Sequence, residues 1–163
     1  MKIRIENKNN KSIVNKPTRL TSLSEYHQFF GGAPKTTFTV AADDATGFSV
    51  AVDAPTKFNL YRSMRLFFAN GGSVCYIVSA GDYSSAVSAK DLNDEAEQKG
   101  IPTLLKAPEP TMLVIPDAVL LEENDCASLQ QAMLMHCGNA TKSRVAILDV
   151  FNGDQERSYD END

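Results

Sequence analysis

Three strand-length apolar runs constrain the fold of this chain more than any other feature. They occupy residues 74–78, 111–115 and 144–150, and helix-like patterns lie between them. Nearly continuous apolar runs of this length are typical of strands that are covered on both faces. Strands that alternate with helices favour parallel pairing through right-handed crossovers. We therefore expect an α/β fold with a mostly parallel sheet of apolar strands flanked by helices.

Capping signals locate the helices. Ser22 can cap a helix at 21–30, and Glu25 follows three residues later to complete a capping box. Glycine takes the left-handed conformation of a helix C-terminus without penalty, so the Gly31-Gly32 pair ends this helix. Similar patterns predict helices at 58–68, 89–99 and 125–136 and one or two helical turns at 101–107, with Asn70-Gly71-Gly72 and Gly138-Asn139 as further stops.

An antiparallel hairpin is expected in the N-terminal third of the chain. Residues 36–40 and 48–52 are rich in β-branched side chains and alternate in polarity, which is typical of strands. Asp43, Asp44 and Gly47 lie between them and suit a turn.

Length and charge suggest one domain with two polar ends. The chain has 163 residues, of which 42% are hydrophobic, enough to bury a core. We expect a polar N-terminal arm at 1–20, a single α/β domain at 21–151, and an acidic tail at 152–163 where a longer chain was cut. The arm is mainly basic and the tail mainly acidic. Both ends are expected to be solvated; the alternative is that one end of a copy meets the opposite end of its neighbour.

Composition disfavours several classes of function. The net charge of −5 disfavours a nucleic-acid-binding protein, which is usually basic. No apolar stretch approaches the roughly 20 residues of a membrane span, and the N-terminus lacks the apolar block of a signal peptide. Three cysteines without tight pairing indicate free thiols in a reducing compartment.

Two aspartates are the only candidates for chemistry at the strand ends. Asp117 and Asp149 each follow an apolar run, and the carboxyl ends of parallel strands are where α/β enzymes place their sites. Such a pair could bind a metal or share a proton. The alternative is that each aspartate caps the helix or turn that follows it, which is the commoner role.

Other motifs of catalysis are missing from the sequence. The glycine-rich segments 31–35 and 70–73 follow helices and lack the spacing of a phosphate loop. His27 and His136 belong to no nucleophile motif. The cysteines at 75, 126 and 137 fall on predicted core faces, and the tail at 154–163 lacks the pattern of a calcium loop. We assign no catalytic, cofactor-binding or metal-binding residue.

Four blocks of sequence, in order, resemble contractile tail sheath proteins. The blocks span 15–32, 60–78, 111–118 and 144–154. In the second block, Phe67-Phe68-Ala69-Asn70-Gly71-Gly72 and Cys75-Tyr76-Ile77-Val78 are similar to the family's Phe-Phe-x-Asn-Gly-Gly helix end and Cys-Tyr-Val-Val strand. In the third and fourth blocks, Ile115-Pro116-Asp117 and Ala146-Ile147-Leu148-Asp149 resemble the family's Ile-Pro-Asp and Ala-Ile-Leu-Asp.

The resemblance implies a structural protein and no enzyme. Sheath subunits stack around an inner tube in phage tails and related bacterial injection systems, and their collective rearrangement drives the tube through a target envelope. The implied partners are copies of the chain in a helical sheath, the tube protein and baseplate components, with no nucleic acid, no membrane insertion and no cofactor. The implied location is the virion tail, or the bacterial cytoplasm where such a particle assembles.

Family members are several hundred residues long and carry terminal extensions that pair with neighbouring subunits. We therefore expect this chain to be a fragment, or an unusually short relative, and monomeric by itself. The rival hypothesis is a small α/β ligand- or nucleotide-binding domain or enzyme that uses Asp117 and Asp149. A deep pocket holding both carboxylates would favour that rival. A second rival is an adaptor domain of another function with the same fold.

Overall fold

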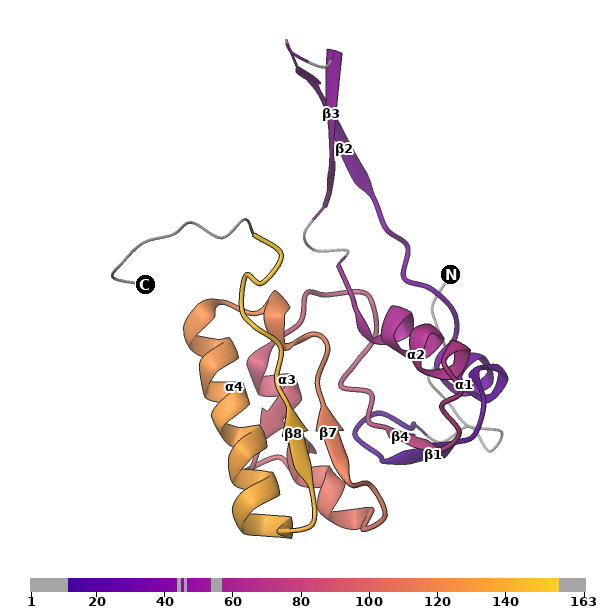
Figure 1. Ribbon diagram of the computed structural model, residues 1–163, viewed down its shortest axis with the longest axis vertical. Coiled ribbons are helices and arrows are strands. Elements are labelled where there is room, and N and C mark those ends of the chain that lie inside the picture. Colours follow the sequence, from indigo (N-terminus) through magenta and orange to yellow (C-terminus); the bar gives the residue numbers. More distant parts are fainter. Residues whose placement is uncertain (1–11, 44, 46, 54–56, 156–163) are drawn as a thin grey trace.

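The computed structural model describes residues 12–43, 45, 47–53 and 57–155 (Figure 1). A projecting hairpin rises from a body in which short strands are covered by helices. In chain order the elements are β1 (Thr18–Leu20), α1 (Leu23–Phe30), β2 (Phe38–Asp43), β3 (Gly47–Val52), α2 (Leu60–Ala69), β4 (Cys75–Ile77), α3 (Ala89–Leu92), β5 (Asn93–Asp94), β6 (Lys99–Gly100), the 3₁₀-helix η2 (Ile101–Lys106), β7 (Met112–Val114), the 3₁₀-helix η3 (Ala118–Leu120), α4 (Glu123–Met135), the π-helix η4 (His136–Thr141) and β8 (Val145–Ile147).

The expectation of a mostly parallel sheet is wrong. The described strands form four separate two-stranded sheets, and only the pair β7–β8 is parallel. β4, which we expected in the parallel sheet, pairs antiparallel with β1, so that Leu20 lies opposite Cys75. An apolar run indicates that a strand is buried but does not specify its partner. Here the chain just before α1 pairs with one edge of β4.

The first of two apolar clusters, which we call the N-terminal core, joins α1 and α2 to the β1–β4 pair. Leu20 and Tyr26 are almost completely buried in it. Two of its members, Ile13 and Leu20, belong to the segment that the sequence suggested was a polar arm. The buried members are Ile13, Leu20, Tyr26, Phe30, Met64 and Ile77.

The start of α1 has the serine cap that the sequence predicts, but the Glu25 carboxylate bonds to Thr21, one residue before the cap. The Ser22 hydroxyl accepts a hydrogen bond from the Glu25 N–H at 3.2 Å, as a capping residue does. The Glu25 carboxylate reaches back to the N–H of Thr21, at 2.7 Å, and to its hydroxyl, at 3.0 Å. These bonds lower the pKa of Glu25 below its ordinary value. Gly31, with φ of 84°, ends the helix as expected.

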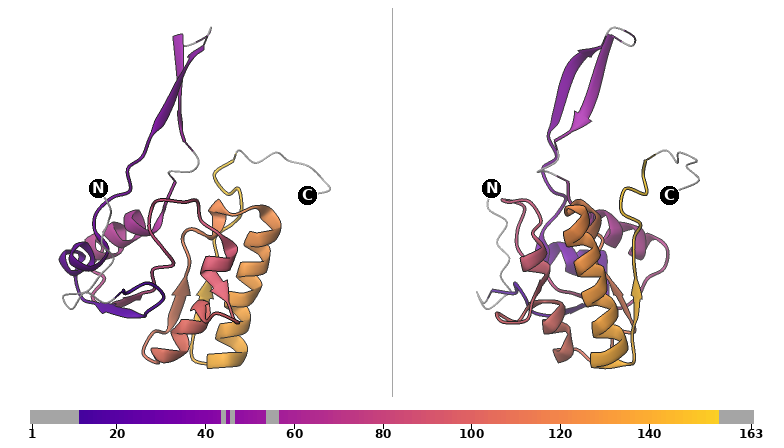
Figure 2. Two further views of the ribbon diagram at one scale, coloured as in Figure 1. Left: turned by 180° about the vertical axis from the view of Figure 1, so that it is seen from behind. Right: turned by 90° about the vertical axis from the view of Figure 1, so that its left-hand side faces the viewer.

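The second cluster, which we call the C-terminal core, lies between α4 and the β7–β8 pair (Figure 2). Its buried members are Ile101, Leu104, Leu113, Ala118, Leu121, Cys126, Leu129, Met133 and Cys137. The glycine at 138 does not end the helix, because the chain continues through η4 until Lys142 adopts a left-handed conformation.

The helix expected at 89–99 is also much shorter than the sequence suggested. It stops at Leu92, and β5 and β6 then form a tight antiparallel turn. The Asp94 carboxylate accepts a hydrogen bond from the Glu97 N–H at 2.9 Å, which favours a turn over a continued helix. The helical turns expected at 101–107 are present as η2.

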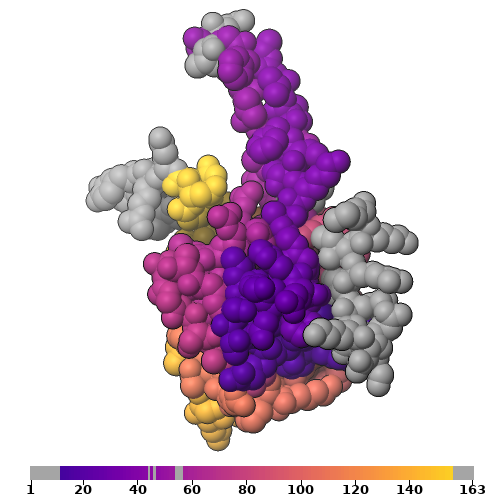
Figure 3. Space-filling model, turned by 90° about the vertical axis from the view of Figure 1, so that its right-hand side faces the viewer, coloured from indigo at the N-terminus to yellow at the C-terminus, as the bar shows by residue number. Residues whose placement is uncertain are grey.

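The β2–β3 hairpin projects from the body as an arm (Figure 3). Its strands are antiparallel, with Phe38 opposite Val52 and Asp43 opposite Gly47. At its base, the Asp53 carboxylate accepts hydrogen bonds from the hydroxyls of Thr37, at 2.6 Å, and Thr39, at 2.7 Å. These bonds hold the two strands together where they leave the body.

Candidate functional site

An apolar cavity of about 610 Å³ lies between α2 and β4 on one side and β7 on the other. Its volume falls in the range of small-molecule sites. Its lining is mainly aliphatic and aromatic, and the charged side chains in it are Glu109, Asp117 and Arg144. Asp117 was a sequence candidate, whereas Arg144 was not.

Asp117 fastens α2 to the end of β7. Its carboxylate accepts a short hydrogen bond from the backbone N–H of Asn59, the residue that precedes α2. The Asn59 side-chain amide donates in return to the Pro116 carbonyl at 3.0 Å. Burial raises the pKa of Asp117, and the backbone hydrogen bonds act in the opposite direction. The sequence alternative was that Asp117 caps the turn that follows it, but Asp117 makes no side-chain capping bond to η3 and instead binds the backbone just before α2.

Asp149 lies elsewhere. Its side chain is exposed and borders a separate depression of about 300 Å³ together with Asn59, Arg62 and Val119. Asp149 does not line the larger cavity, and Asp117 does not line the smaller one. The structure therefore does not bring the two carboxylates into one pocket, which the rival hypothesis requires.

Arg144 occupies the cavity end near the start of β8, and its guanidinium is bound by protein groups. It donates hydrogen bonds to the carbonyls of Pro110 at 3.0 Å and Leu104 at 3.1 Å, to the Ala107 carbonyl, and to Nε2 of His136 at 2.9 Å. The acceptor role of Nε2 requires a neutral imidazole. Burial and the adjacent Arg144 charge lower the pKa of His136. The sequence signal for this site was a single cation at the edge of an apolar strand, which is too weak to find a buried group.

The remaining sequence candidates have local structural roles. In the second glycine segment, Gly71, with φ of 86°, follows the end of α2. His27 is exposed and stacks on Tyr61. Cys126 and Cys137 are buried in the C-terminal core, which matches their expected positions, and Cys75 is half-buried. Among the described residues, no group of three or more His, Cys, Asp or Glu side chains could hold a metal ion.

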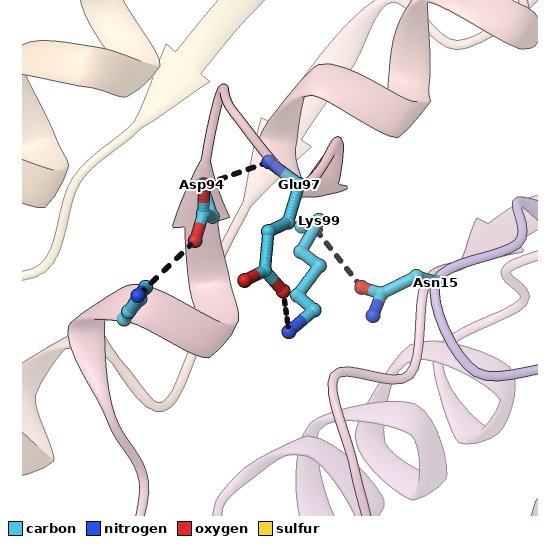
Figure 4. A network of polar contacts seen from close by, with 6 residues as sticks. Asn15, Asp94, Glu97 and Lys99 are labelled. Carbon is cyan, nitrogen blue, oxygen red and sulfur yellow. Dashed lines mark hydrogen bonds and ion pairs between the residues drawn. The ribbon is translucent and has the colours of Figure 1, made fainter.

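A cluster of polar side chains surrounds the β5–β6 turn (Figure 4). Lys90 and Asp94 are 3.9 Å apart, and Lys99 pairs with Glu97. The Asn15 side-chain oxygen accepts a hydrogen bond from the Gly100 N–H at 2.9 Å. These polar groups bond to one another, close the turn and attach the segment before β1 to it.

Solvent-exposed apolar faces are the more unusual feature of this molecule. Side chains that lie opposite one another in the hairpin share a face, so one face is apolar and the other is small and polar. The large side chains of the apolar face are exposed at 38–65%. We call this surface the arm face, and it comprises Phe38, Val40, Ala42, Phe48, Val50 and Val52.

The β7–β8 pair carries a second apolar surface. Leu113 and Ala146 face the C-terminal core, and the alternate residues point the other way. These outward side chains are exposed at 46–64%, and two of them, Met112 and Val114, also belong to the lining of the apolar cavity. We call this surface the sheet face, and it comprises Met112, Val114, Val145 and Ile147.

Comparisons with known proteins add no relative: no protein-family model matches the chain, and no curated protein matches it. A further search of the described residues shows no helix with both the length and the apolar character needed to cross a bilayer.

Proposed function

We propose that this chain is a structural subunit, or part of one, of a contractile tail sheath that acts by assembly. The proposal rests on the four ordered blocks of sequence that resemble this family. Residues within those blocks make structural joints in this chain: Gly71 follows the end of α2, and Asp117 binds the backbone at its start. Motif residues that connect secondary-structure elements are consistent with a structural protein.

The exposed apolar faces support the same proposal. A surface that leaves many large apolar side chains in water marks an interaction site more often than an idle surface. Here the arm face and the sheet face lie on different elements, so the molecule can contact more than one neighbour. The proposed partners are copies of the chain, an inner tube protein and baseplate components. The proposed location is a virion tail, or the bacterial cytoplasm where such a particle assembles.

Electron microscopy of assembled particles tests this function. The complete reading frame that contains these residues would be expressed with and without the tube protein encoded beside it. The expected result is a tubular assembly of regular diameter in negative stain when the tube protein is present. A protein that stays monomeric in all conditions, and forms no tubes with its tube protein, would contradict the proposal.

A further inference from the structure

We propose that the arm face of one copy packs on the sheet face of a second copy. This inference rests on the proposed function and deepens it by naming the two surfaces that meet. The arm cannot cover the sheet face of its own chain, because it projects away from the body (Figures 1 and 2). In a head-to-tail array, one neighbouring copy covers the arm face and a different neighbouring copy covers the sheet face.

The area of the two faces fits a weak, repeated contact. Their exposed side chains, Phe38, Val40, Phe48, Val50 and Val52 on the arm and Met112, Val114, Val145 and Ile147 on the sheet, amount to on the order of 900 Å² of apolar surface. A specific interface needs roughly 1,000 Å² in total. One such contact is therefore near the lower limit for a stable pair, and repetition along an assembly would strengthen it.

Charge complementarity sets the direction of the contact. Within the described part of the arm, between residues 38 and 52, the charged side chain is Asp43, which lies at the end of β2 beside the turn. Near the start of β7 and β8 the chain carries exposed Lys106 and Lys142. The nearby acid Glu109 lies 3.6 Å from Arg19, so its charge is already compensated. The acidic tip therefore lies toward the starting ends of β7 and β8.

Alternation along the arm provides a matched pair of positions for the test. Val50 lies on the arm face, whereas its neighbour Ser49 lies on the opposite face and is also exposed. In a Cys75→Ala background, Val50→Cys protein would be mixed at high concentration with a Val145→Cys protein of different tagged length, under mild oxidation. The control mixture replaces Val50→Cys by Ser49→Cys.

The expected result is a mixed disulfide between the two tagged lengths, formed at least tenfold faster with Val50→Cys than with Ser49→Cys. Equal rates for the two mixtures would overturn the proposal, as would the absence of any mixed disulfide. A product made only of Val50→Cys pairs would also overturn it, because the arm would then pack on another arm.

Failure of the inference can be told apart from failure of the proposed function. The same cysteine pair would be placed in the complete reading frame and examined in its tubes. Tubes without the mixed disulfide would refute the contact and leave the sheath function standing. A mixed disulfide from a protein that forms no tubes would support the contact and refute the sheath function.

Discussion

At the scale of single residues, the partly buried Asp117 carboxylate links the end of β7 to the start of α2. We expect Asp117→Asn to keep the free energy of unfolding at pH 7 within about 1 kcal/mol of wild type. Its amide oxygen can still accept from the Asn59 N–H and needs less solvation than a carboxylate. Asp117→Ala leaves that donor without its partner and should lose about 1–3 kcal/mol. Urea unfolding measures both values.

The pH dependence provides a second readout of Asp117. Its folded pKa is raised by burial, so the folded state holds this proton more tightly than the unfolded state. The contribution of Asp117 to stability therefore increases as the pH falls through the folded pKa toward the ordinary value of 3.8. That increase should disappear in Asp117→Asn. If the Asn variant is as unstable as the Ala variant, the negative charge itself is required.

His136 has the opposite effect in acid. Burial and Arg144 hold its folded pKa below the ordinary 6.5, against a smaller opposing effect of Glu95. The unfolded state therefore binds this proton more readily, and stability is lost as the pH falls below 6.5. One proton limits the slope to about 1.4 kcal/mol per pH unit. In His136→Gln, unfolding measured from pH 7 to pH 5 should show a shallower loss, and an unchanged slope would refute this role.

At the scale of elements, the β5–β6 turn depends on one glycine. Gly100 has φ of 63°, and a Cβ there would overlap the Leu92 carbonyl. We expect Gly100→Ala to lose about 3 kcal/mol or more, because backbone has to move. Gly81→Ala is the matched control, since nothing lies within 4 Å of its Cβ position. Thermal unfolding of both variants measures the difference, and equal melting temperatures would contradict this account.

The sequence could predict most individual elements, for reasons that are local. The Ser22 cap, the glycines at 31 and 71 and the alternation along the arm all act within a few residues, and the structure has the corresponding helix ends and strands. The helix expected at 89–99 failed because Asp94 turns the chain, an effect that competes with weak helix propensity.

At the scale of the whole molecule, local sequence patterns do not determine which strands pair. The apolar run at 74–78 could not show that β4 would pair with β1, because buried strands of either direction look alike in sequence. The candidate site failed for a different reason, because β7 and β8 do lie side by side in one parallel pair. The Asp117 carboxylate binds the backbone before α2, whereas Asp149 is exposed, so the two carboxylates line different pockets.

The proposed contact predicts how the mass of the assembly grows. Two different faces on each copy make a head-to-tail contact, which does not end at a dimer. Sedimentation velocity over rising concentration should therefore show species beyond the dimer, in contrast to the expectation from the resemblance that the chain is monomeric by itself. We expect Val50→Lys to suppress them and Ser49→Lys to leave them unchanged, since only Val50 lies on the arm face. Growth that stops at a dimer would contradict head-to-tail packing.

The two roots of the arm determine where tension applied to its tip would go. One root leads back to Gly31 at the end of α1, in the N-terminal core, and the other leads to Asn59, which Asp117 ties to the end of β7. Single-molecule pulling through residue 45 should therefore meet less resistance in Asp117→Ala than in wild type. A force applied to the arm is therefore shared between the N-terminal core and the end of β7, so the molecule moves as a unit under that force.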